Sequence, residues 1–274
     1  MEQYGGTGHR LERRERREAA PEPGSAGREA QPARGASVLV TGGSRGIGKA
    51  IALRFAGLGA SRVAIGYLRS DTAAEATAAE LRALGAEPIL VRGNVSSARV
   101  LEQVGALGPL DVLVHNAASG VIRPALETED KHWDWTLGAN ARALLALARV
   151  AAPAMPAGSS IVGISSLGSQ RVLENYTLVG TSKAALEALV RYLAVELAPR
   201  GIRVNAVSAG VVETGALDHF PNREQMLEEG ARNPAGRLVT PEDVAATVAF
   251  LCSPGAEMIR GQTVVVDGGY SLPA

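Results

Sequence analysis

The sequence predicts an α/β protein: a single doubly wound domain in which helices flank a seven-stranded parallel sheet. Seven short runs rich in β-branched and apolar residues alternate with longer helical patterns, which is typical of parallel sheets with crossover helices. The run at 110–114 is apolar throughout, as a strand buried on both faces requires. Ligands of such sheets bind at the carboxyl ends of the strands, so residues that follow strands are the candidates for a site.

Composition narrows the class of protein. Of the 274 residues, 46% are hydrophobic, which allows a sizeable core, and 28 basic side chains balance 28 acidic ones. This balance disfavours nucleic-acid and membrane partners. The single cysteine, Cys252, fits a reducing cytoplasm, and no apolar run reaches membrane-spanning length. We therefore expect a cytoplasmic protein. The four histidines are scattered without ligand spacing, so we expect no metal site.

The first 35 residues differ from the rest of the chain. Arginine and glutamate alternate between Arg10 and Glu18, and prolines and glycines follow up to Gly35. This pattern predicts a disordered, charged extension over 1–35, ahead of a domain over 36–274. The extension lacks the apolar centre of a secretory signal, and its glutamates argue against a transit peptide. A solvated tail and a tether to a larger assembly both stay open.

The first strand and helix enclose a glycine-rich turn. A β-rich run at 37–40 precedes the turn, and an alanine- and leucine-rich helix follows it to about Leu58. Glycines let a backbone approach a pyrophosphate closely, and a helix N-terminus offers N–H donors and a positive dipole end. Strand, turn and helix together predict a Rossmann-type dinucleotide site. Its candidate cofactor-binding residues are Thr41, Gly42, Ser44, Arg45, Gly46, Ile47 and Gly48.

The end of the second strand, at 62–67, indicates which dinucleotide binds. A site for NADH usually carries an acid there, but this chain has Tyr67 and Arg69 before its first acid, Asp71. Arg45 and Arg69 could face a 2′-phosphate, because a guanidinium matches a phosphate in charge and geometry. The sequence therefore favours NADPH, with Tyr67 and Arg69 as further cofactor contacts. Merely solvated arginines are the alternative.

Three asparagines follow or accompany the next elements. Asn94, followed by Val95, ends the third strand, where its amide could bond an adenine edge. Asn116 and Ala117 follow the fourth strand. Asn140 lies among small and apolar residues of a long helix, and a buried asparagine needs partners, so it is a structural link or a site member. The strands expected here are 88–92 and 110–114, and the helices are 71–84, 96–107 and 133–149.

The stretch from Ser165 to Lys183 contains a tyrosine and a lysine at a suggestive spacing. A strand at 159–165 leads into it, and a helix at 184–197 follows it. Tyr176 and Lys183 lie seven residues apart, which is about two turns of a helix and puts both side chains on one face. A phenol beside an ammonium can donate a proton at neutral pH. Taken alone, an ordinary strand–helix junction with a tyrosine is the alternative.

The last third completes the sheet with strands at 202–207 and 262–266. Between them, 218–230 mixes apolar and charged residues, which predicts a short lid over a substrate or else an ordinary surface insertion. Thr240 is the expected N-cap of a helix that begins at Pro241.

From about Ala36 to Ala274 the chain resembles the short-chain dehydrogenase/reductase family. The motifs that carry the resemblance are the glycine turn, the Asn116-Ala117 pair and the ending at 261–269. The resemblance implies a nicotinamide cofactor and a homo-oligomer, either a tetramer or a dimer.

The same resemblance implies site residues. Asn140, Ser166 and Lys183 stand where the family has its active-site Asn, Ser and Lys. Gly210, Val212 and Thr214 resemble the loop that clasps the nicotinamide, and Lys183 would also hold the nicotinamide ribose. Ala209 replaces the proline that is usual in that loop.

One departure from the family is informative. Most members have a tyrosine four residues before the lysine, and that position here is Val179, which cannot donate a proton. Serine and lysine keep their register, while the nearby phenol, Tyr176, stands three residues earlier. A tyrosine seven residues before the lysine resembles the enoyl-acyl-carrier-protein reductases, and the run from Ser165 to Tyr176 is similar to their type III (FabL-type) members.

The resemblance implies NADPH-dependent reduction of trans-2-enoyl thioesters on acyl carrier protein or CoA, in fatty acid elongation or a related acyl pathway. It gives Tyr176 the role of hydrogen-bond donor to the thioester oxygen, with Lys183 beside it. Ser166 either assists at that oxygen or caps the strand end, and Asn140 orders a helix kink or a water. A 3-oxoacyl or ketone reductase, and a catalytically weak NADPH-binding protein, are the alternatives.

Overall fold

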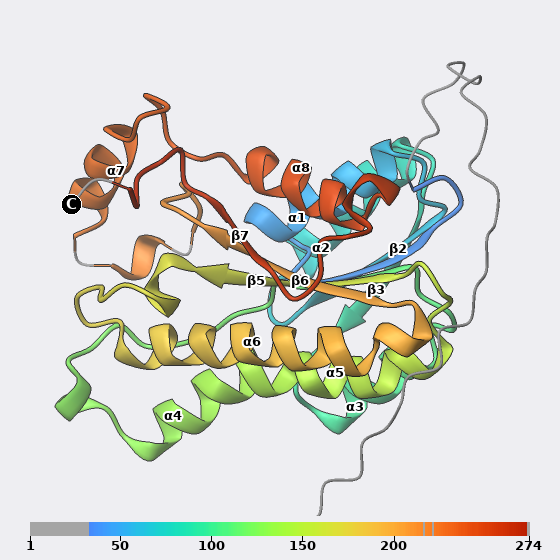
Figure 1. Ribbon diagram of the computed structural model, residues 1–274, viewed down its shortest axis with the longest axis horizontal. Coiled ribbons are helices and arrows are strands. Elements are labelled where there is room, and N and C mark those ends of the chain that lie inside the picture. Colours follow the sequence, from blue (N-terminus) through green and yellow to red (C-terminus); the bar gives the residue numbers. More distant parts are fainter. Residues whose placement is uncertain (1–32, 216, 221, 273–274) are drawn as a thin grey trace, which may run out of the picture. The chain divides into compact units, whose positions relative to one another are not determined.

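The computed structural model describes residues 33–215, 217–220 and 222–272 (Figure 1). Within these residues, seven strands form one parallel sheet in the order β3-β2-β1-β4-β5-β6-β7, which confirms the predicted doubly wound fold. The strands are β1 (Ser37–Thr41), β2 (Arg62–Tyr67), β3 (Glu87–Arg92), β4 (Val112–His115), β5 (Ser160–Ser166), β6 (Arg203–Ala209) and β7 (Thr263–Val266).

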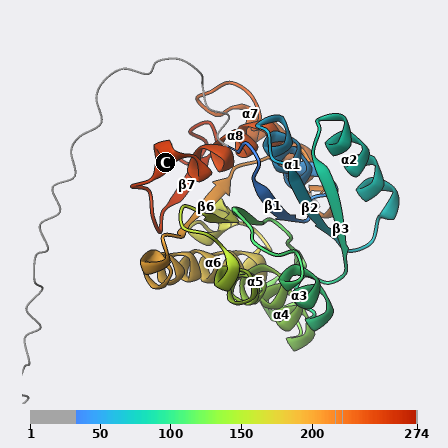
Figure 2. The same cartoon turned by 90° about the vertical axis from the view of Figure 1, so that its right-hand side faces the viewer.

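Helices cover both faces of the sheet (Figure 2). α1, α2 and α8 lie on one face, where α1 packs against both others, and α3, α4, α5 and α6 lie on the other. The helices are α1 (Gly46–Gly57), α2 (Asp71–Ala83), α3 (Ala98–Gly105), α4 (Asp130–Leu137), α5 (Ala143–Ala151), α6 (Thr177–Glu196), α7 (Arg223–Ala231) and α8 (Pro241–Cys252). A buried apolar cluster fills the space on each side of the sheet, which is what fixes the helices to it.

The pairing register brings four strand ends to one edge. Thr41 pairs with His115 across β1 and β4, and Ser166 pairs with Ala209 across β5 and β6. His115 in turn pairs with Gly163 of β5. The segments that leave these strands therefore meet above the middle of the sheet, where the crossovers change direction and a crevice opens in doubly wound folds.

α6 begins at Thr177, seven residues before the helix start expected near Ala184. Threonine, valine and glycine at the start of this segment have low helix propensity, so the sequence predicts a helix only from about Ala184. Packing overrides propensity here: a Cβ on Gly180 would lie 2.6 Å from the carbonyl oxygen of Gly168, so glycine lets the helix approach the end of β5 closely. Tyr176 consequently stands immediately before the helix rather than within a loop.

The long helix expected over 133–149 is present but not uniform. It runs from Asp130 to Ala151 as α4, a π-helical turn (η2, Gly138–Arg142) and α5. Asn140 is at the centre of that turn. π-Helical turns often mark functional sites. The other strands and helices begin and end within three residues of their expected positions.

The expected extension over 1–35 lies largely outside the described residues, which begin at Ala33. Ala33 is already buried in the core, and Gly35 donates a backbone hydrogen bond to Gly59. In the described part of the chain, none of the helices has both the length and the apolar character needed to cross a membrane.

Candidate active site

The glycine turn between β1 and α1 is shaped to receive an anionic group. Gly42 and Gly46 have φ angles of 67° and 53°, in the region that favours glycine. A Cβ on Gly48 would overlap the carbonyl oxygen of Gly42, so a side chain there would force the turn apart. The Arg45 side chain makes no capping hydrogen bond to α1, and the first turn of α1 contains no acidic residue. The N–H groups and positive dipole end of α1 therefore fit the pyrophosphate of a dinucleotide.

Neighbouring elements hold this turn in place. Thr77 on α2 donates a hydrogen bond to the carbonyl oxygen of Ser44 at 3.1 Å, and Ile47 packs against the core. The Asn116 side chain donates to the carbonyl oxygens of Thr41 at 3.0 Å and Gly42 at 3.1 Å. Both amide hydrogens of Asn116 are thereby used, so this residue shapes the cofactor turn from the side.

Thr41 joins the ends of β1 and β4. Its hydroxyl oxygen accepts hydrogen bonds from the backbone N–H groups of Asn116 at 3.1 Å and Ala117 at 3.0 Å. Its own hydrogen is left for Nδ1 of His115, 3.2 Å away. Nε2 of His115 then donates to the carbonyl oxygen of Asn140 at 3.1 Å. His115 links the cofactor turn to the π-helical turn. Burial, and then the charge of Lys183, lowers the pKa of His115 to about 4, so it is neutral at pH 7.

The residues at the ends of β2 and β3 are those from which the sequence predicts ribose and adenine contacts. Asp71 already has partners, since Oδ1 accepts from the Tyr67 hydroxyl at 2.9 Å and Oδ2 pairs with Arg92 at 3.2 Å. Arg45 and Arg69 are exposed. Asn94 accepts hydrogen bonds through Oδ1 from the backbone N–H and the hydroxyl of Ser96, and Val95 packs against the core.

Ser166, Tyr176 and Lys183 converge at the end of β5. Ser166 is the last residue of the strand, and its Oγ accepts hydrogen bonds from the Gly168 N–H at 3.3 Å and the Tyr176 hydroxyl at 3.4 Å. Lys183 is 5% exposed, and its Nζ donates to the carbonyl oxygen of Ile164 at 2.7 Å. The structure therefore brings together three of the four predicted catalytic side chains, with the fourth, Asn140, behind them.

Burial sets the protonation of the tyrosine and the lysine. It raises the pKa of Tyr176, against a smaller lowering by the hydrogen bond with Ser166, so the phenol stays protonated. It lowers the pKa of Lys183 to about 8, against the attraction of Glu187. A protonated phenol can donate a hydrogen bond to a developing oxyanion, and the lysine that contacts the same strand end titrates near pH 8.

Two glycines and an unusual backbone angle place the Tyr176 ring. A Cβ on Gly168 would lie 2.5 Å from the ring atoms Cδ1 and Cε1, so the ring lies directly against that backbone. Gly180 allows the same segment to approach α6. Asn175, just before the tyrosine, has φ 58°, a left-handed conformation that asparagine tolerates better than most residues. Its carbonyl oxygen accepts a hydrogen bond from the Arg123 N–H at 2.9 Å.

Val179 and Asn140 have structural surroundings. Val179 is 8% exposed, and a Cβ on Gly120 would overlap its side chain, so it packs against the loop after β4. Asn140 is fully buried. Its side chain bonds the backbone of Ser119 twice and the hydroxyl of Ser182 at 2.8 Å. The Asn140 side chain is thus enclosed by the protein, and it secures the π-helical turn next to α6.

The segment after β6 folds over both parts of the site. A Cβ on Gly210 would lie 2.8 Å from that of Asp267, which requires glycine where this segment leaves the sheet. Val212 is buried and pairs with Val239, and the Thr214 side chain lies against Gly46 of the glycine turn. Phe220 contacts Tyr176, with ring centroids 5.9 Å apart.

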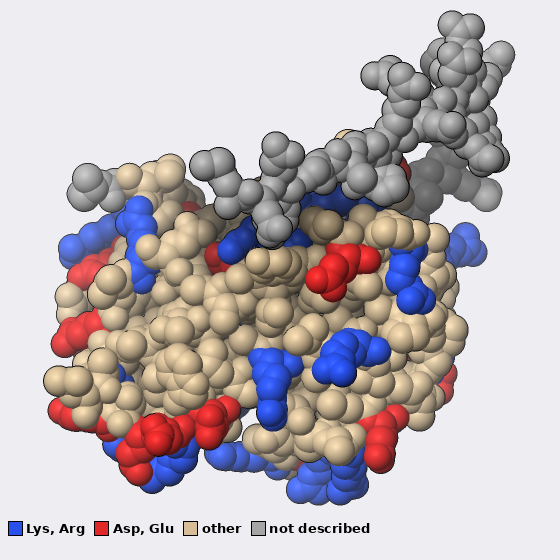
Figure 3. All heavy atoms as spheres, turned by 60° about the horizontal axis from the view of Figure 1, so that its bottom comes forward, with Lys and Arg blue, Asp and Glu red and all other residues tan. Residues whose placement is uncertain are grey.

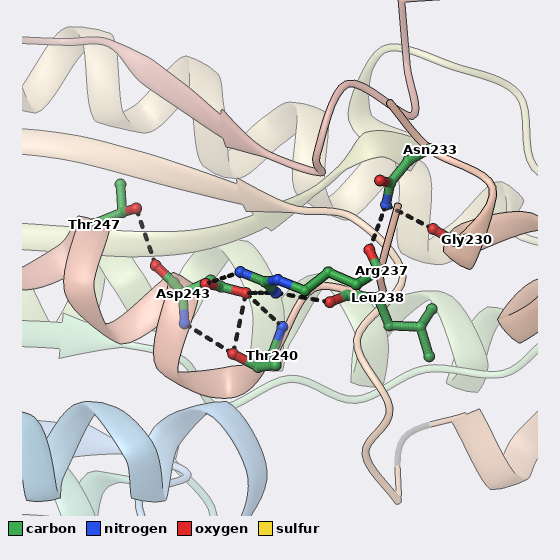
Figure 4. A network of polar contacts seen from close by, with 7 residues as sticks. All are labelled: Gly230, Asn233, Arg237, Leu238, Thr240, Asp243 and Thr247. Carbon is green, nitrogen blue, oxygen red and sulfur yellow. Dashed lines mark hydrogen bonds and ion pairs between the residues drawn. The ribbon is translucent and has the colours of Figure 1, made fainter. Parts of the chain in front are cut away.

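Ion pairs hold the expected lid, residues 218–230, in place. Pro221 of this segment lies outside the described residues. Arg223 at the start of α7 pairs with Glu213 at 2.9 Å and with Asp218 at 3.4 Å. The residues between α7 and α8 are held by a second network (Figure 4). There Arg237 forms a two-point ion pair with Asp243, and Asn233 donates to the carbonyl oxygens of Gly230 and Arg237. The lid is therefore anchored at both of its ends.

Residues 42–271 match the sequence profile of a protein family described as "Enoyl-(Acyl carrier protein) reductase". This range includes the glycine turn, the Ser166–Lys183 stretch and the lid. The chain belongs to the short-chain dehydrogenase/reductase family.

Individual relatives of this reductase have different substrates. The 1-cyclohexenylcarbonyl-CoA reductase of Streptomyces collinus is 38% identical over 244 residues, 86% of this chain and 87% of the relative. The L-xylulose reductase of Bos taurus is 36% identical, over 86% of this chain and 96% of the relative. A short-chain dehydrogenase from Burkholderia cenocepacia, solved in complex with NADP, has a TM-score of 0.79 at 35% identity, over 87% of this chain and 99% of that structure. The protein is an oxidoreductase with a nicotinamide cofactor.

Two residues of this short-chain reductase escaped the sequence analysis. His115 looked like one of several scattered histidines, yet it ends an otherwise apolar strand directly before Asn116. Glu187 is 4% exposed among the apolar residues of α6, one helical turn beyond Lys183. The sequence signal for Glu187 is a charged residue within an apolar helical stripe. Because a buried charge needs partners, this signal indicates a polar network around it.

Proposed function

We propose that this reductase uses NADPH to reduce trans-2-enoyl thioesters, carried on acyl carrier protein or CoA. The observation that carries the proposal is the placement of Tyr176: its hydroxyl reaches Ser166 beside buried Lys183, while Val179 is packed away and has no proton to donate. When bound, NADPH supplies a hydride, which the β-carbon of the substrate double bond accepts. Negative charge then develops on the thioester oxygen, and Tyr176 donates a hydrogen bond to it. The enolate takes up a proton at its α-carbon, from Tyr176 or from water, and the saturated thioester results.

The displaced phenol suits this reaction. A ketone reductase must protonate the oxygen on the carbon that receives hydride, whereas an enoyl reductase must reach a carbonyl two carbons further on. Three residues of helix correspond to about 4.5 Å. Tyr176 stands just before α6, where Phe220 of the lid contacts its ring and Ser166 accepts from its hydroxyl.

Lys183 and Ser166 support the donor. The Lys183 ammonium, held by the Ile164 carbonyl, keeps the potential at the strand end positive and is available to the nicotinamide ribose. Ser166 accepts from Tyr176 in the resting site, which keeps the phenol oriented until a substrate oxygen replaces the serine. Asn140 acts indirectly, by holding the π-helical turn beside α6.

The relatives lend support to a thioester substrate. The name of the Streptomyces collinus relative describes a CoA thioester with a carbon–carbon double bond next to the carbonyl. The description of the matching family also names an acyl-carrier-protein substrate. A sugar or ketone substrate is the second candidate, because the L-xylulose reductase is nearly as similar.

The preference for NADPH follows from the charges around the expected ribose. Arg45 and Arg69 make no ion pair with another described residue, so both guanidinium groups are available to a 2′-phosphate. Asp71 would otherwise suit NADH, but Tyr67 and Arg92 occupy both of its oxygens. The other predicted cofactor contacts remain part of this proposal: Thr41, Gly42, Ser44, Gly46, Ile47, Gly48, Tyr67, Asn94, Val95, Asn116, Ala117, Lys183, Gly210, Val212 and Thr214.

We also propose that the protein forms a homo-oligomer, with a tetramer as the expected form. Between isolated charges of both signs, the face formed by α4, α5 and α6 has broad uncharged areas (Figure 3). Exposed hydrophobic side chains on α4 and α6 are Trp133, Trp135, Tyr192 and Val195. Sedimentation velocity of the purified protein decides between monomer, dimer and tetramer.

The decisive experiment follows NADPH absorbance with crotonyl and acetoacetyl thioesters of CoA and of acyl carrier protein. We expect NADPH oxidation with the crotonyl thioesters and little with the acetoacetyl thioesters. Turnover of the acetoacetyl thioesters alone would overturn the proposal in favour of a 3-oxoacyl reductase. Turnover of L-xylulose but of no thioester would favour the sugar candidate.

A further inference from the structure

Glu187 is a buried acid that the proposed mechanism does not use. It lies on α6 one turn beyond Lys183 and is 4% exposed. Its carboxylate accepts hydrogen bonds from the hydroxyls of Ser165 at 2.5 Å and Ser169 at 2.6 Å, and from the Gln170 amide at 3.3 Å. A buried charge is costly unless it is paired and hydrogen-bonded, so this arrangement requires an explanation beyond filling space.

The partners of Glu187 belong to the segment that carries Ser166. Ser165 immediately precedes Ser166 at the end of β5, and Ser169 closes the short helical turn η4 (Leu167–Ser169) after it. The carboxylate therefore accepts hydrogen bonds from residues on both sides of Ser166. Lys183, on the same helix, donates to the carbonyl oxygen of Ile164 at the same strand end. Through these two side chains, α6 holds the segment on both sides of Ser166, at Ile164, Ser165, Ser169 and Gln170.

The carboxylate also acts on the ammonium of Lys183. The titratable groups whose charge interacts with that of Lys183 are Glu187 on its own helix and His115 on β4, and Tyr176 reaches Ser166 at the same strand end. His115 is neutral at pH 7, and burial raises the pKa of Tyr176, so the phenol is neutral as well. Glu187 is thus the negative partner that opposes the effect of burial on Lys183.

We propose that Glu187 is a positioning residue, which locks Ser166 and Lys183 relative to one another so that the Tyr176 hydroxyl meets the substrate oxygen with a charged lysine beside it. This inference rests on the proposed function for the roles of Tyr176 and Lys183. A role that is merely structural would make Glu187 matter for folding but leave the titration of the active site unchanged.

The test compares Glu187→Gln with Glu196→Gln in the full-length protein. Glu187→Gln keeps the size and one acceptor oxygen but removes the charge, whereas Glu196 is an exposed acid at the end of the same helix. We expect the Glu187 variant to keep Tm and the Kd for NADPH close to wild type and to lose about tenfold or more in kcat. The alkaline limb of its kcat profile should move to lower pH, because Lys183 loses the carboxylate that raises its pKa.

Ser169→Ala tests the geometric half separately, since it removes one grip on the segment and leaves the charge. We expect a smaller fall in kcat with the alkaline limb unchanged. If Glu187→Gln does not fold, a Ser169→Ala variant with wild-type kcat overturns the proposal. If Glu187→Gln folds, wild-type kcat and an unmoved limb overturn it and leave Glu187 as a core residue.

The choice of substrate keeps this test independent of the proposed function. Both variants are assayed with whichever of the crotonyl, acetoacetyl and L-xylulose substrates the wild type turns over. Failure of the wild type on crotonyl thioesters overturns the proposed reaction. Failure of Glu187→Gln to change kcat or the pH limb on the active substrate overturns the positioning role.

Discussion

Tyr176 donates a hydrogen bond to Ser166 across 3.4 Å and so joins the residue before α6 to the last residue of β5. Two turns along the helix, Lys183 bonds the carbonyl oxygen of Ile164, two residues before that serine. Phenol and ammonium are therefore both fixed to the same strand end. Val179 packs against Gly120, so the side chain at the family's usual tyrosine position takes no part in this arrangement.

Removing the phenol hydroxyl should abolish most of the reduction. Tyr176→Phe keeps the ring that packs on Gly168 but removes the donor to the substrate oxygen. We expect kcat to fall by roughly a hundredfold or more, as for removal of one oxyanion donor, with NADPH binding near normal. Tyr192→Phe, an exposed tyrosine on the same helix, is the matched control and should leave kcat unchanged. Wild-type kcat in Tyr176→Phe would show that another group is the donor.

The pH dependence of activity should follow Lys183. Burial lowers its pKa to about 8, so the ammonium is present below that pH and is lost above it. Because burial raises the pKa of Tyr176, the phenol stays protonated through the same range. We expect kcat/KM for the thioester to be level below about pH 7 and to fall as pH rises through about 8. A profile that stays level to pH 10 would contradict a charged lysine in the working site.

Much of the fold was predictable because its signals are local. Gly42, Gly46 and Gly48 are required by the turn that they form, and the capping box of Thr240 and Asp243 marks the start of α8 within four residues of sequence. The unbroken apolar runs identified buried parallel strands for the same reason.

The remainder depended on contacts between distant segments. The sequence does not predict the start of α6, because the residues there have low helix propensity. The helix is stabilised instead by close packing of Gly180 on Gly168, a contact between segments that no local pattern shows. The π-helical turn at Asn140 depends on bonds to Ser119 and Ser182. In the site, the spacing of Tyr176 and Lys183 was visible in the sequence. The place of Glu187 was not, because its partners lie 17 to 22 residues away.

The left-handed backbone of Asn175 should matter for both stability and activity. Its φ of 58° directs the chain into Tyr176. Asn175→Gly should be close to neutral, whereas Asn175→Val should cost about 1–2 kcal/mol, because a β-branched residue is disfavoured in this conformation. Thermal unfolding and kcat measure the two effects, and the valine variant should lower both Tm and kcat. Equal values for the two variants would show that the left-handed conformation is dispensable.

Cofactor preference should reside in the exposed arginines. Arg69→Ala should raise the KM for NADPH by about tenfold while that for NADH changes little, since NADH has no 2′-phosphate for a guanidinium to bind. Arg54→Ala, an exposed arginine at the end of α1, is the control for a general loss of positive charge. Equal increases in KM for both cofactors would place Arg69 outside the phosphate site.

The anchor of the lid should make stability fall in acid. The pKa of Asp243 is held well below its ordinary value, first by the Arg237 guanidinium and then by the Thr240 backbone. The stabilisation from this pair is therefore complete above the ordinary aspartate pKa and is lost as pH falls toward the lowered one. Asp243→Ala also removes the capping box of α8 and should cost about 1 kcal/mol at pH 7, measured by urea unfolding.

Glu242→Gln, at the neighbouring exposed position, keeps the capping box and should have a much smaller effect. The difference in unfolding free energy between wild type and Asp243→Ala should shrink as pH falls below about 4, because protonation breaks the wild-type ion pair. A difference that stays constant down to pH 2 would show that Asp243 acts through its size and neutral hydrogen bonds rather than through its charge. Because the backbone carbonyl oxygen of Arg237 also accepts from the Asn233 side chain beside the lid, loss of the ion pair should raise the KM for the thioester as well.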